Sequence, residues 1–189
     1  MGGDMMESDE ELIELANRGE AEAFEALYLR YREWVYRLAW RFTGDREDAL
    51  DVLQETFAYL LGKFPGPACR QARFELTAAL TTFLYPVIKH LAIATCNKNG
   101  RFSSDVEVLC EFAAPESQEP GGSRADLAAV LAALSADQRE VVLMRFVDSM
   151  SLQEIAGALD IPLGTVKSRL HNALNTLRDD RRTRDYFLE

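Results

Sequence analysis

The sequence contains few of the residues that bind metals or form covalent cross-links. Its 189 residues include three cysteines and two histidines. Cys69, Cys96 and Cys110 are odd in number, far apart, and form no Cys-x-x-Cys pair. We therefore expect neither a disulfide framework nor a structural zinc site, and the thiols are expected to be buried or idle.

Long apolar runs and signal-peptide features are also missing. No stretch approaches the roughly 20 apolar residues that cross a bilayer as a helix. The first residues, MGGDMMESDEE, are acidic and contain no apolar core of a secretory signal. The sequence therefore predicts a cytoplasmic protein with no membrane insertion.

The common catalytic patterns are absent as well. The chain has no glycine-rich phosphate loop, no nucleophile elbow, and no Ser/His/Asp or Cys/His set spaced for nucleophilic catalysis. Strand-like alternation and internal repeats are missing too. These absences argue against an enzyme and against a cofactor, and they favour an all-α binding protein.

Charge is distributed unevenly along the chain. Acidic residues outnumber basic ones by 31 to 21, which gives a net charge of −10. Two segments are nevertheless basic: residues 65–101 contain 5 basic residues and 1 acidic residue, and residues 167–184 contain 6 and 2. This pattern fits a protein that binds DNA in one context and avoids it elsewhere, although chance clustering of surface charge gives the same pattern.

Apolar residues at helical spacing predict an all-α protein with two small domains, over residues 1–101 and 124–189. Between them, residues 102–123 have no helical or strand period and contain five acidic residues with two prolines and two adjacent glycines. We interpret this stretch as an acidic flexible linker. The expected helices before the C-terminal pair cover residues 10–18, 20–43, 46–63, 73–97, 126–134 and 137–147. Gly44 is expected to end the second of these and Asp45 to cap the third, whose buried positions are expected to include Leu50 and Leu61.

The stretch from Ser151 to Asn175 predicts two short helices joined by a tight turn. Ser151 and Glu154 form a Ser-x-x-Glu capping box at the start of the first helix. Pro162 then interrupts the helical pattern. Asp160 stands where such turns usually place glycine, and aspartate tolerates the left-handed region better than most residues. These features are typical of a helix-turn-helix, whose second helix enters the major groove of DNA.

The second of these helices has an apolar stripe and a polar face. Side chains of the kind found on the polar face suit phosphates and base edges. The alternative is an ordinary helical hairpin whose polar face is solvated. The stripe consists of Val166, Leu170, Ala173, Leu174 and Leu177, and the face of Lys167, Ser168, Arg169, His171 and Asn172.

The expected helix over residues 46–63 has an acidic face. At about 100° per residue, Asp48, Asp51 and Glu55 lie on one side. Three hypotheses compete: a solvated face, a Mg²⁺ site of a helical nucleotide hydrolase, and a surface that docks a basic partner. A metal site needs a matching carboxylate cluster on a second helix, and the sequence offers none, so docking is the better hypothesis.

The expected helix over residues 73–97 contains Pro86, which costs about 3 kcal/mol in a regular helix interior, so we predict a kink or a break there. Aromatic and basic residues follow each other around this point. Such a mixture suits melted DNA, where bases stack on rings and phosphates meet charges, although the rings are equally suited to a core. The set is Phe83, Tyr85, Lys89, His90, Lys98 and Arg101.

Two blocks of the chain together resemble one family, the bacterial RNA polymerase sigma factors of the extracytoplasmic-function (ECF) group. The first block, Phe24 to Phe64, carries the pattern Gly-Asp-x-x-Asp-Ala-x-Asp-x-x-Gln-Glu-x-Phe. The second, Leu134 to Leu174, carries Gly-Thr-Val-Lys-Ser-Arg-Leu. The order of the blocks, their spacing and the linker match as well, and the resemblance covers most of residues 10–180.

The resemblance implies a protein that binds core RNA polymerase and promoter DNA and has no catalytic centre. Members of the family are often held by an anti-sigma factor, but no feature of the sequence identifies one. The implied contacts with core polymerase are Asp48, Asp51, Gln54, Glu55 and Phe57. The implied contacts with the upstream promoter element are Arg145, Ser151, Thr165, Lys167, Ser168, Arg169, His171 and Asn172, and those with the downstream element are Phe83, Tyr85, Lys89, His90, Lys98 and Arg101.

One region departs from the family pattern. Relatives tend to have Trp-Leu, then Asn, then Asp-x-x-Arg, where this chain has Phe83-Leu84, His90, and Ala94 with Asn97. The region supplies downstream-element recognition and DNA melting in the family. We therefore expect either an unusual downstream element or weak DNA opening. A stand-alone helix-turn-helix regulator with a sensory or partner-binding N-terminal domain is the alternative to a sigma factor.

Overall fold

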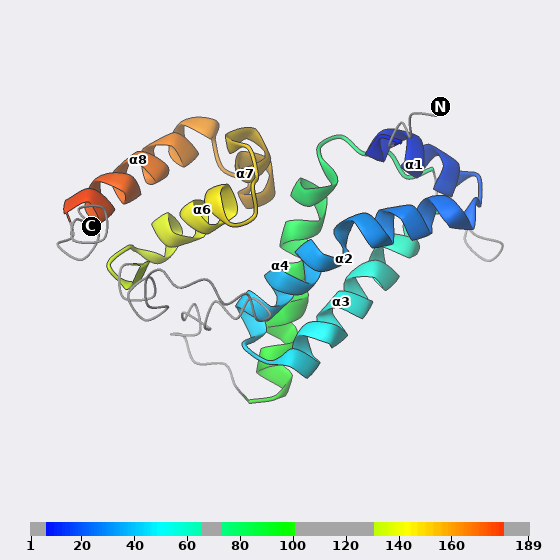
Figure 1. The fold of residues 1–189 in the computed structure, drawn as a ribbon, viewed down its shortest axis with the longest axis horizontal. Helices are drawn as coiled ribbons and strands as arrows, with labels where there is room; N and C mark the ends of the chain where they lie inside the picture. Colours follow the sequence, from blue (N-terminus) through cyan, green and yellow to red (C-terminus); the bar gives the residue numbers. More distant parts are fainter. Residues whose placement is uncertain (1–6, 66–72, 101–130, 180–189) are drawn as a thin grey trace, which may run out of the picture.

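The computed structural model describes residues 7–65, 73–100 and 131–179, and in these ranges the chain forms α-helices and no strand (Figure 1). The expectation of an all-α fold is therefore confirmed for this part of the chain. No helix in the described ranges has the length and apolarity needed to cross a membrane. The helices are α1 (Asp9–Asn17), α2 (Ala21–Thr43), α3 (Arg46–Leu61), α4 (Leu80–Lys98), α6 (Ala136–Phe146), α7 (Leu152–Leu159) and α8 (Leu163–Asp179).

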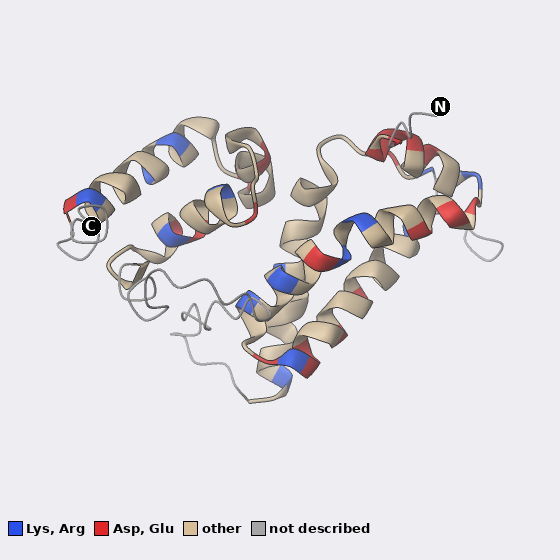
Figure 2. Ribbon diagram, in the orientation of Figure 1, with Lys and Arg blue, Asp and Glu red and all other residues tan. Residues whose placement is uncertain are grey.

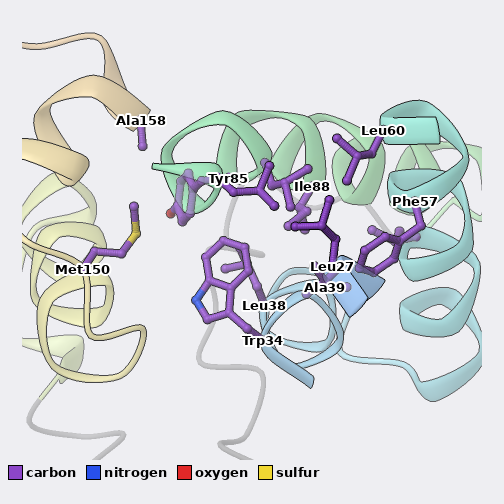
Figure 3. Close-up of a cluster of buried hydrophobic side chains, with 14 of the residues drawn as sticks. Leu27, Trp34, Leu38, Ala39, Phe57, Leu60, Tyr85, Ile88, Met150 and Ala158 are labelled. Carbon is purple, nitrogen blue, oxygen red and sulfur yellow. The ribbon is translucent and has the colours of Figure 1, made fainter. Parts of the chain in front are cut away.

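The N-terminal helices α2, α3 and α4 lie side by side, and α1 packs on α2 (Figure 1). Their facing surfaces bury large aliphatic side chains, as Figure 3 shows for Leu27, Leu38, Leu60 and Ile88, all fully buried. Burial of one such side chain contributes about 1.5–3 kcal/mol. This shared apolar core positions the outer faces of the three helices.

The turn between α2 and α3 follows directly from its sequence. Gly44 ends α2 in the left-handed conformation with φ of 65°, which glycine adopts without a steric cost. Asp45 then caps α3, because its side chain accepts hydrogen bonds from the backbone N–H groups of Glu47 and Asp48. Both features agree with the sequence-based expectation.

The buried face of α3 differs from the expected one. We predicted that Leu50 and Leu61 point into the core, but they are 39% and 54% exposed. The inward positions include Val52 and Thr56 instead, and the Thr56 hydroxyl donates to the Val52 carbonyl oxygen within the helix. The prediction was wrong because α3 has apolar residues around most of its circumference, so periodicity alone does not identify the face that meets α2 and α4.

The segment before α4, residues 73–79, is irregular rather than helical. We predicted a helix from residue 73, but α4 begins at Leu80. Asn17 binds both backbone polar groups of Phe74 in this segment. Its Nδ2 donates to the Phe74 carbonyl oxygen at 2.8 Å, and its Oδ1 accepts from the Phe74 N–H at 2.9 Å. This pair of hydrogen bonds satisfies the Phe74 backbone without a helix.

Pro86 does not break α4, which is one continuous helix from Leu80 to Lys98, so of the expected kink or break, the break does not occur. A proline inside a helix removes one hydrogen bond and costs about 3 kcal/mol. Pro86 is on the exposed side, while Leu84, Tyr85 and Ile88 around it are fully or almost fully buried. Burial of three large side chains offsets the cost of the proline, and the helix continues.

The C-terminal domain contains the predicted helix-turn-helix. Ser151 and Glu154 make the expected capping box, with the Ser151 hydroxyl accepting from the Glu154 N–H and the carboxylate accepting from the Ser151 N–H. Asp160 ends α7 in the left-handed conformation, with φ of 51°. On α8, Val166 and Ala173 are buried, whereas Leu174, expected in the buried stripe, is 39% exposed.

The two groups of helices share a core. Met150 and Ala158 from the C-terminal domain belong to the same buried cluster as Trp34 and Tyr85 from the N-terminal domain (Figure 3). Helix α7 packs against α4, while α8 lies on the far side of α6 and α7 (Figure 1).

Several expectations fall on residues outside the described ranges: the linker at 102–123, most of the helix at 126–134, the end of the chain from residue 180, Arg101, Cys69 and Cys110. The remaining cysteine, Cys96, is buried on α4, with its thiol 3.8 Å from the Phe42 carbonyl oxygen.

We expect Asp160→Gly to raise the free energy of unfolding of the C-terminal domain by about 0.5–1 kcal/mol. The left-handed conformation costs a non-glycine residue roughly 1–2 kcal/mol, and the greater freedom of glycine in the unfolded chain offsets part of that gain. The urea midpoint of unfolding measures the effect. Asp160→Ala should lower the midpoint. Equal midpoints for the two variants would contradict the claim that the backbone at residue 160 is strained.

Candidate functional site

The outer side of α8 presents a continuous polar face. Lys167, Ser168, His171 and Asn172 are all exposed, at three- and four-residue spacing. They are exposed because Val166 and Ala173 on the opposite side anchor the helix against the rest of the domain. Together with Arg169 we call these residues the α8 polar face; Figure 2 shows basic segments along α8.

Arg169 is less available than its neighbours on α8. Its guanidinium pairs with the Asp137 carboxylate, and its side chain is 28% exposed against 60% for Asp137. An exposed carboxylate partner binds weakly, so a phosphate or a base edge can displace it. Any contact of Arg169 with another anion therefore requires the guanidinium to leave Asp137.

The remaining residues predicted to contact the upstream element have structural roles within the domain. Arg145 donates from Nη1 to the Met150 carbonyl oxygen at 2.9 Å. Ser151 caps α7 with its hydroxyl. Thr165 is half-buried in the first turn of α8, and its carbonyl oxygen accepts from the Ser168 hydroxyl.

Five residues of α3 are predicted to contact core polymerase, and they do not all face the same way. Asp51, Gln54 and Glu55 are exposed and adjacent on the helix surface, and we call them the α3 acidic face. Asp48 is only 6% exposed, and its Oδ1 accepts from Asn99 Nδ2 at 2.8 Å. Phe57 is 5% exposed and packs edge-on against other rings in the core.

Burial of Asp48 bears on the metal hypothesis, because it separates Asp48 from the exposed carboxylates of Asp51 and Glu55. Over residues 7–65, 73–100 and 131–179, no group of three or more His, Cys, Asp and Glu side chains is placed to hold a metal ion.

The residues predicted to contact the downstream element do not form one surface: some contact other side chains, and others are exposed. Tyr85 and Lys89 both donate to one oxygen of Glu140 on α6, at 2.8 Å and 2.6 Å. Phe83 stacks on Tyr59 with ring centroids 6.2 Å apart. His90 and Lys98 are exposed on other sides of α4, and Arg101 lies beyond the described ranges.

Where the two domains meet, burial and nearby charges shift the pKa values of Tyr85 and Arg41. Burial raises the pKa of Tyr85 far above its ordinary value, and the nearby Glu140 carboxylate adds to the shift. For Arg41, burial alone would lower the pKa, but the Asp148 carboxylate outweighs it, so the pKa is raised. Arg41 therefore stays charged inside the interface.

Sequence reasoning missed three residues of this region: Arg41, Glu140 and Asp148. Arg41 and Asp148 are 107 positions apart, and no periodicity or motif connects positions so distant. The sequence offered only an indirect signal: Arg41 lies near the buried stripe of its helix, and a charged residue in such a place needs a partner.

The chain matches two family descriptions at the places where these surfaces lie: "Sigma-70 region 2" over residues 27–102 and "Sigma-70, region 4" over residues 124–177. It is 34% identical over 170 residues to the ECF RNA polymerase sigma factor SigL of Mycobacterium tuberculosis, covering 86% of this chain and 91% of SigL. The chain belongs to the ECF sigma factors. The RNA polymerase sigma-H factor of Pseudomonas aeruginosa is 31% identical over 184 residues, covering 88% and 90%.

Solved structures of sigma factors have a similar fold. The sigma factor RpoE of Bartonella quintana, in complex with the anti-sigma factor NepR, is 25% identical, with a TM-score of 0.59 and coverage of 82% of this chain and 94% of that one. CnrH, in complex with the cytosolic domain of CnrY, is 21% identical, with a TM-score of 0.63 and coverage of 91% and 96%.

Membership of the ECF group decides between the functional hypotheses. Sigma factors direct RNA polymerase to promoters at transcription initiation and are not enzymes, so this ECF sigma factor is a transcription initiation factor. This membership argues against the two alternative hypotheses, a magnesium-dependent hydrolase and a stand-alone regulator. The roles of individual residues stay predictions.

Proposed function

We propose that this ECF sigma factor binds core RNA polymerase through the α3 acidic face and reads the upstream promoter element with the α8 polar face. The observation that carries the second assignment is the row of exposed polar side chains on α8, directly after a capped α7 and a left-handed turn at Asp160. This geometry suits entry of α8 into the major groove. The protein would act in the cytoplasm, where core polymerase transcribes.

The first assignment is supported by the exposure of Asp51, Gln54 and Glu55. Carboxylates that point to solvent and have no role in the core suit a basic partner surface. Asp48, which binds Asn99, and Phe57, which packs on Tyr28, would support the face from within the domain rather than touch polymerase.

Contacts with the downstream element are proposed for α4, where Lys89 and Lys98 supply positive charge, His90 an imidazole and Tyr85 an aromatic ring. The boundaries at residues 101 and 124 are proposed to separate this function from upstream recognition. An anti-sigma factor is a further proposed partner, because the similar RpoE of Bartonella quintana forms a complex with the anti-sigma factor NepR.

Arg169→Ala tests the reading of the upstream element. If Arg169 leaves Asp137 to contact a base, the variant should lose about 1–3 kcal/mol of binding free energy at promoters with the preferred base. Selection of promoters from a randomised duplex library by the reconstituted holoenzyme gives the measurement. The preference should disappear at one position of the upstream element.

The control is Asp137→Ala, which frees Arg169 and should strengthen binding slightly. A loss that is equal for all DNA sequences would assign Arg169 to a phosphate instead of a base. Unchanged selection in Arg169→Ala would contradict its role in recognition.

A further inference from the structure

An exposed hydrogen bond on α8 joins His171 to a residue outside the α8 polar face. Asn175 Nδ2 lies 3.0 Å from His171 Nε2. The two residues are four positions apart, so they are neighbours on the helix surface, one turn from each other. His171 is exposed, whereas Asn175 is half-buried. The hydrogen bond therefore ties a residue proposed to meet DNA to one that the domain partly covers.

The chemistry of the amide determines which nitrogen of the His171 ring carries the hydrogen. An amide nitrogen has two hydrogens to donate and accepts none, so the ring nitrogen that faces it has to be the acceptor. In a neutral imidazole the other nitrogen then carries the hydrogen. The hydrogen bond with Asn175 thus places the hydrogen of the His171 ring on Nδ1.

The Nδ1–H group is the part of the His171 ring that is left to read DNA. A donor fits the major-groove edges of guanine and thymine, which present acceptors and no amino group. It does not fit the amino groups of adenine and cytosine, which need an acceptor. A neutral histidine without a fixed partner can place its hydrogen on either nitrogen and can therefore meet both kinds of edge. The hydrogen bond with Asn175 removes this ambiguity.

The place of Asn175 along α8 favours an action through His171 over a contact of its own with a base. Helix α8 begins at Leu163, and in a helix-turn-helix the N-terminal residues of the second helix contact base edges. Asn175 is one turn, about 5.4 Å, further from that end than His171. Gly164 lies two turns before His171 on the same side, and an added Cβ atom there would meet nothing within 4 Å. The N-terminal end of this row is thus open to a groove, and Asn175 lies at the other end.

We propose that Asn175 is a positioning residue for upstream-element recognition: it holds His171 with the hydrogen on Nδ1, so that His171 selects a guanine or a thymine. This inference rests on the proposed reading of the upstream element by the α8 polar face. A ring that is already held in place loses less rotational freedom when DNA binds. Asn175 therefore contributes to affinity as well as to selection, although it touches no base.

Nuclear magnetic resonance of the full chain tests the first step without DNA. The chain contains two histidines, so long-range ¹H–¹⁵N correlations of both rings can be told apart. At mildly alkaline pH, where free imidazole groups are neutral, the hydrogen of His171 should be on Nδ1 in the wild type. Asn175→Ala should give a mixture of the two forms. Asn175→Asp, whose carboxylate only accepts, should move the hydrogen to Nε2.

Asn172→Ala is the matched control for these spectra. It removes an exposed asparagine from the same helix, whereas the His171 ring is bonded to Asn175. This variant should keep the wild-type signals of His171, and the signals of His90 on α4 should be the same in every variant. A hydrogen on Nε2 of His171 in the wild type would overturn the inference, as would identical His171 signals in the wild type and in Asn175→Ala.

Selection of promoters from a randomised duplex library by the reconstituted holoenzyme tests the second step. The wild type should prefer guanine or thymine at one position of the upstream element, and His171→Ala should lose this preference. Asn175→Ala should weaken the preference and lower the affinity for the selected promoter about threefold to tenfold. Asn175→Ala added to His171→Ala should have no further effect, since a positioning residue acts only through the residue that it holds.

The outcomes of the selection separate a positioning role from a contact with DNA. A further loss in the double variant would overturn the inference, because Asn175 would then contact DNA itself. An unchanged preference in either single variant would overturn it as well. Failure of the proposed function would look different, because Arg169→Ala and Asn172→Ala would then also leave promoter selection unchanged.

Discussion

Asp51→Arg is expected to weaken binding to core RNA polymerase by about 3 kcal/mol or more, which is roughly a hundredfold or more. Asp51 is an exposed member of the α3 acidic face, so the substitution removes no buried contact. Replacement of a carboxylate by a guanidinium reverses the local charge and places it against a basic partner. Fluorescence anisotropy of the labelled protein with core polymerase, without DNA, measures the affinity.

Two controls separate a local contact from a general effect of charge in this experiment. Glu33→Arg changes the net charge by the same amount at an exposed position on α2 and should keep nearly full affinity. Thermal unfolding of Asp51→Arg should match that of the wild type. An equal loss of affinity in Glu33→Arg would show that total charge, and not the α3 acidic face, governs binding.

Phe57→Ala is expected to lower the free energy of unfolding of the N-terminal domain by about 3–5 kcal/mol. The Phe57 ring packs edge-on against Phe24 and Tyr28, with centroids 6.5 Å and 4.8 Å away, and removal of it leaves a cavity between α2 and α3. For a domain of this size, each kcal/mol lowers the melting temperature by roughly 4–8 °C. Calorimetry or circular dichroism gives the melting temperature.

The same variant tests which member of the family motif touches polymerase. Phe57→Leu keeps most of the buried volume and should recover most of the stability and of core binding at low temperature. If Phe57→Ala kept its melting temperature but lost core binding, the ring would be a direct contact and its placement in the core would be wrong.

Local features of the fold were predictable because short-range chemistry determines them. The capping box of Ser151 and Glu154, the left-handed Gly44 and the cap at Asp45 each depend on residues within four positions. Asp160 takes the left-handed conformation in the turn for the same reason. Helix boundaries consequently agree with the predicted ones within a few residues, except at the start of α4.

The errors arose where a distant contact decides between local options. Residues 73–79 have the composition of a helix, but Asn17 binds the backbone of Phe74 in an irregular segment. Pro86 would break an isolated helix, whereas burial of its neighbours against α2 and α3 keeps α4 continuous. Local propensity is a weak prior when tertiary packing contributes more free energy.

The candidate site was predictable in part. The α8 polar face follows from spacing, because Val166 and Ala173 had to turn inward. The division of the α3 residues into exposed Asp51 and buried Asp48 did not follow, since it depends on Asn99 at the end of α4. The ion pair of Arg41 and Asp148 depends on how two domains meet, which no sequence pattern in either domain encodes.

The most direct test of the account is transcription from genomic DNA of the source organism by core RNA polymerase with and without this protein, with mapping of RNA 5′ ends. We predict discrete new start sites that share an upstream and a downstream element at fixed spacing. These sites should disappear with Asp51→Arg and be retained with Glu33→Arg. No new start sites with the folded wild-type protein present would contradict the assignment of a promoter-directing sigma factor.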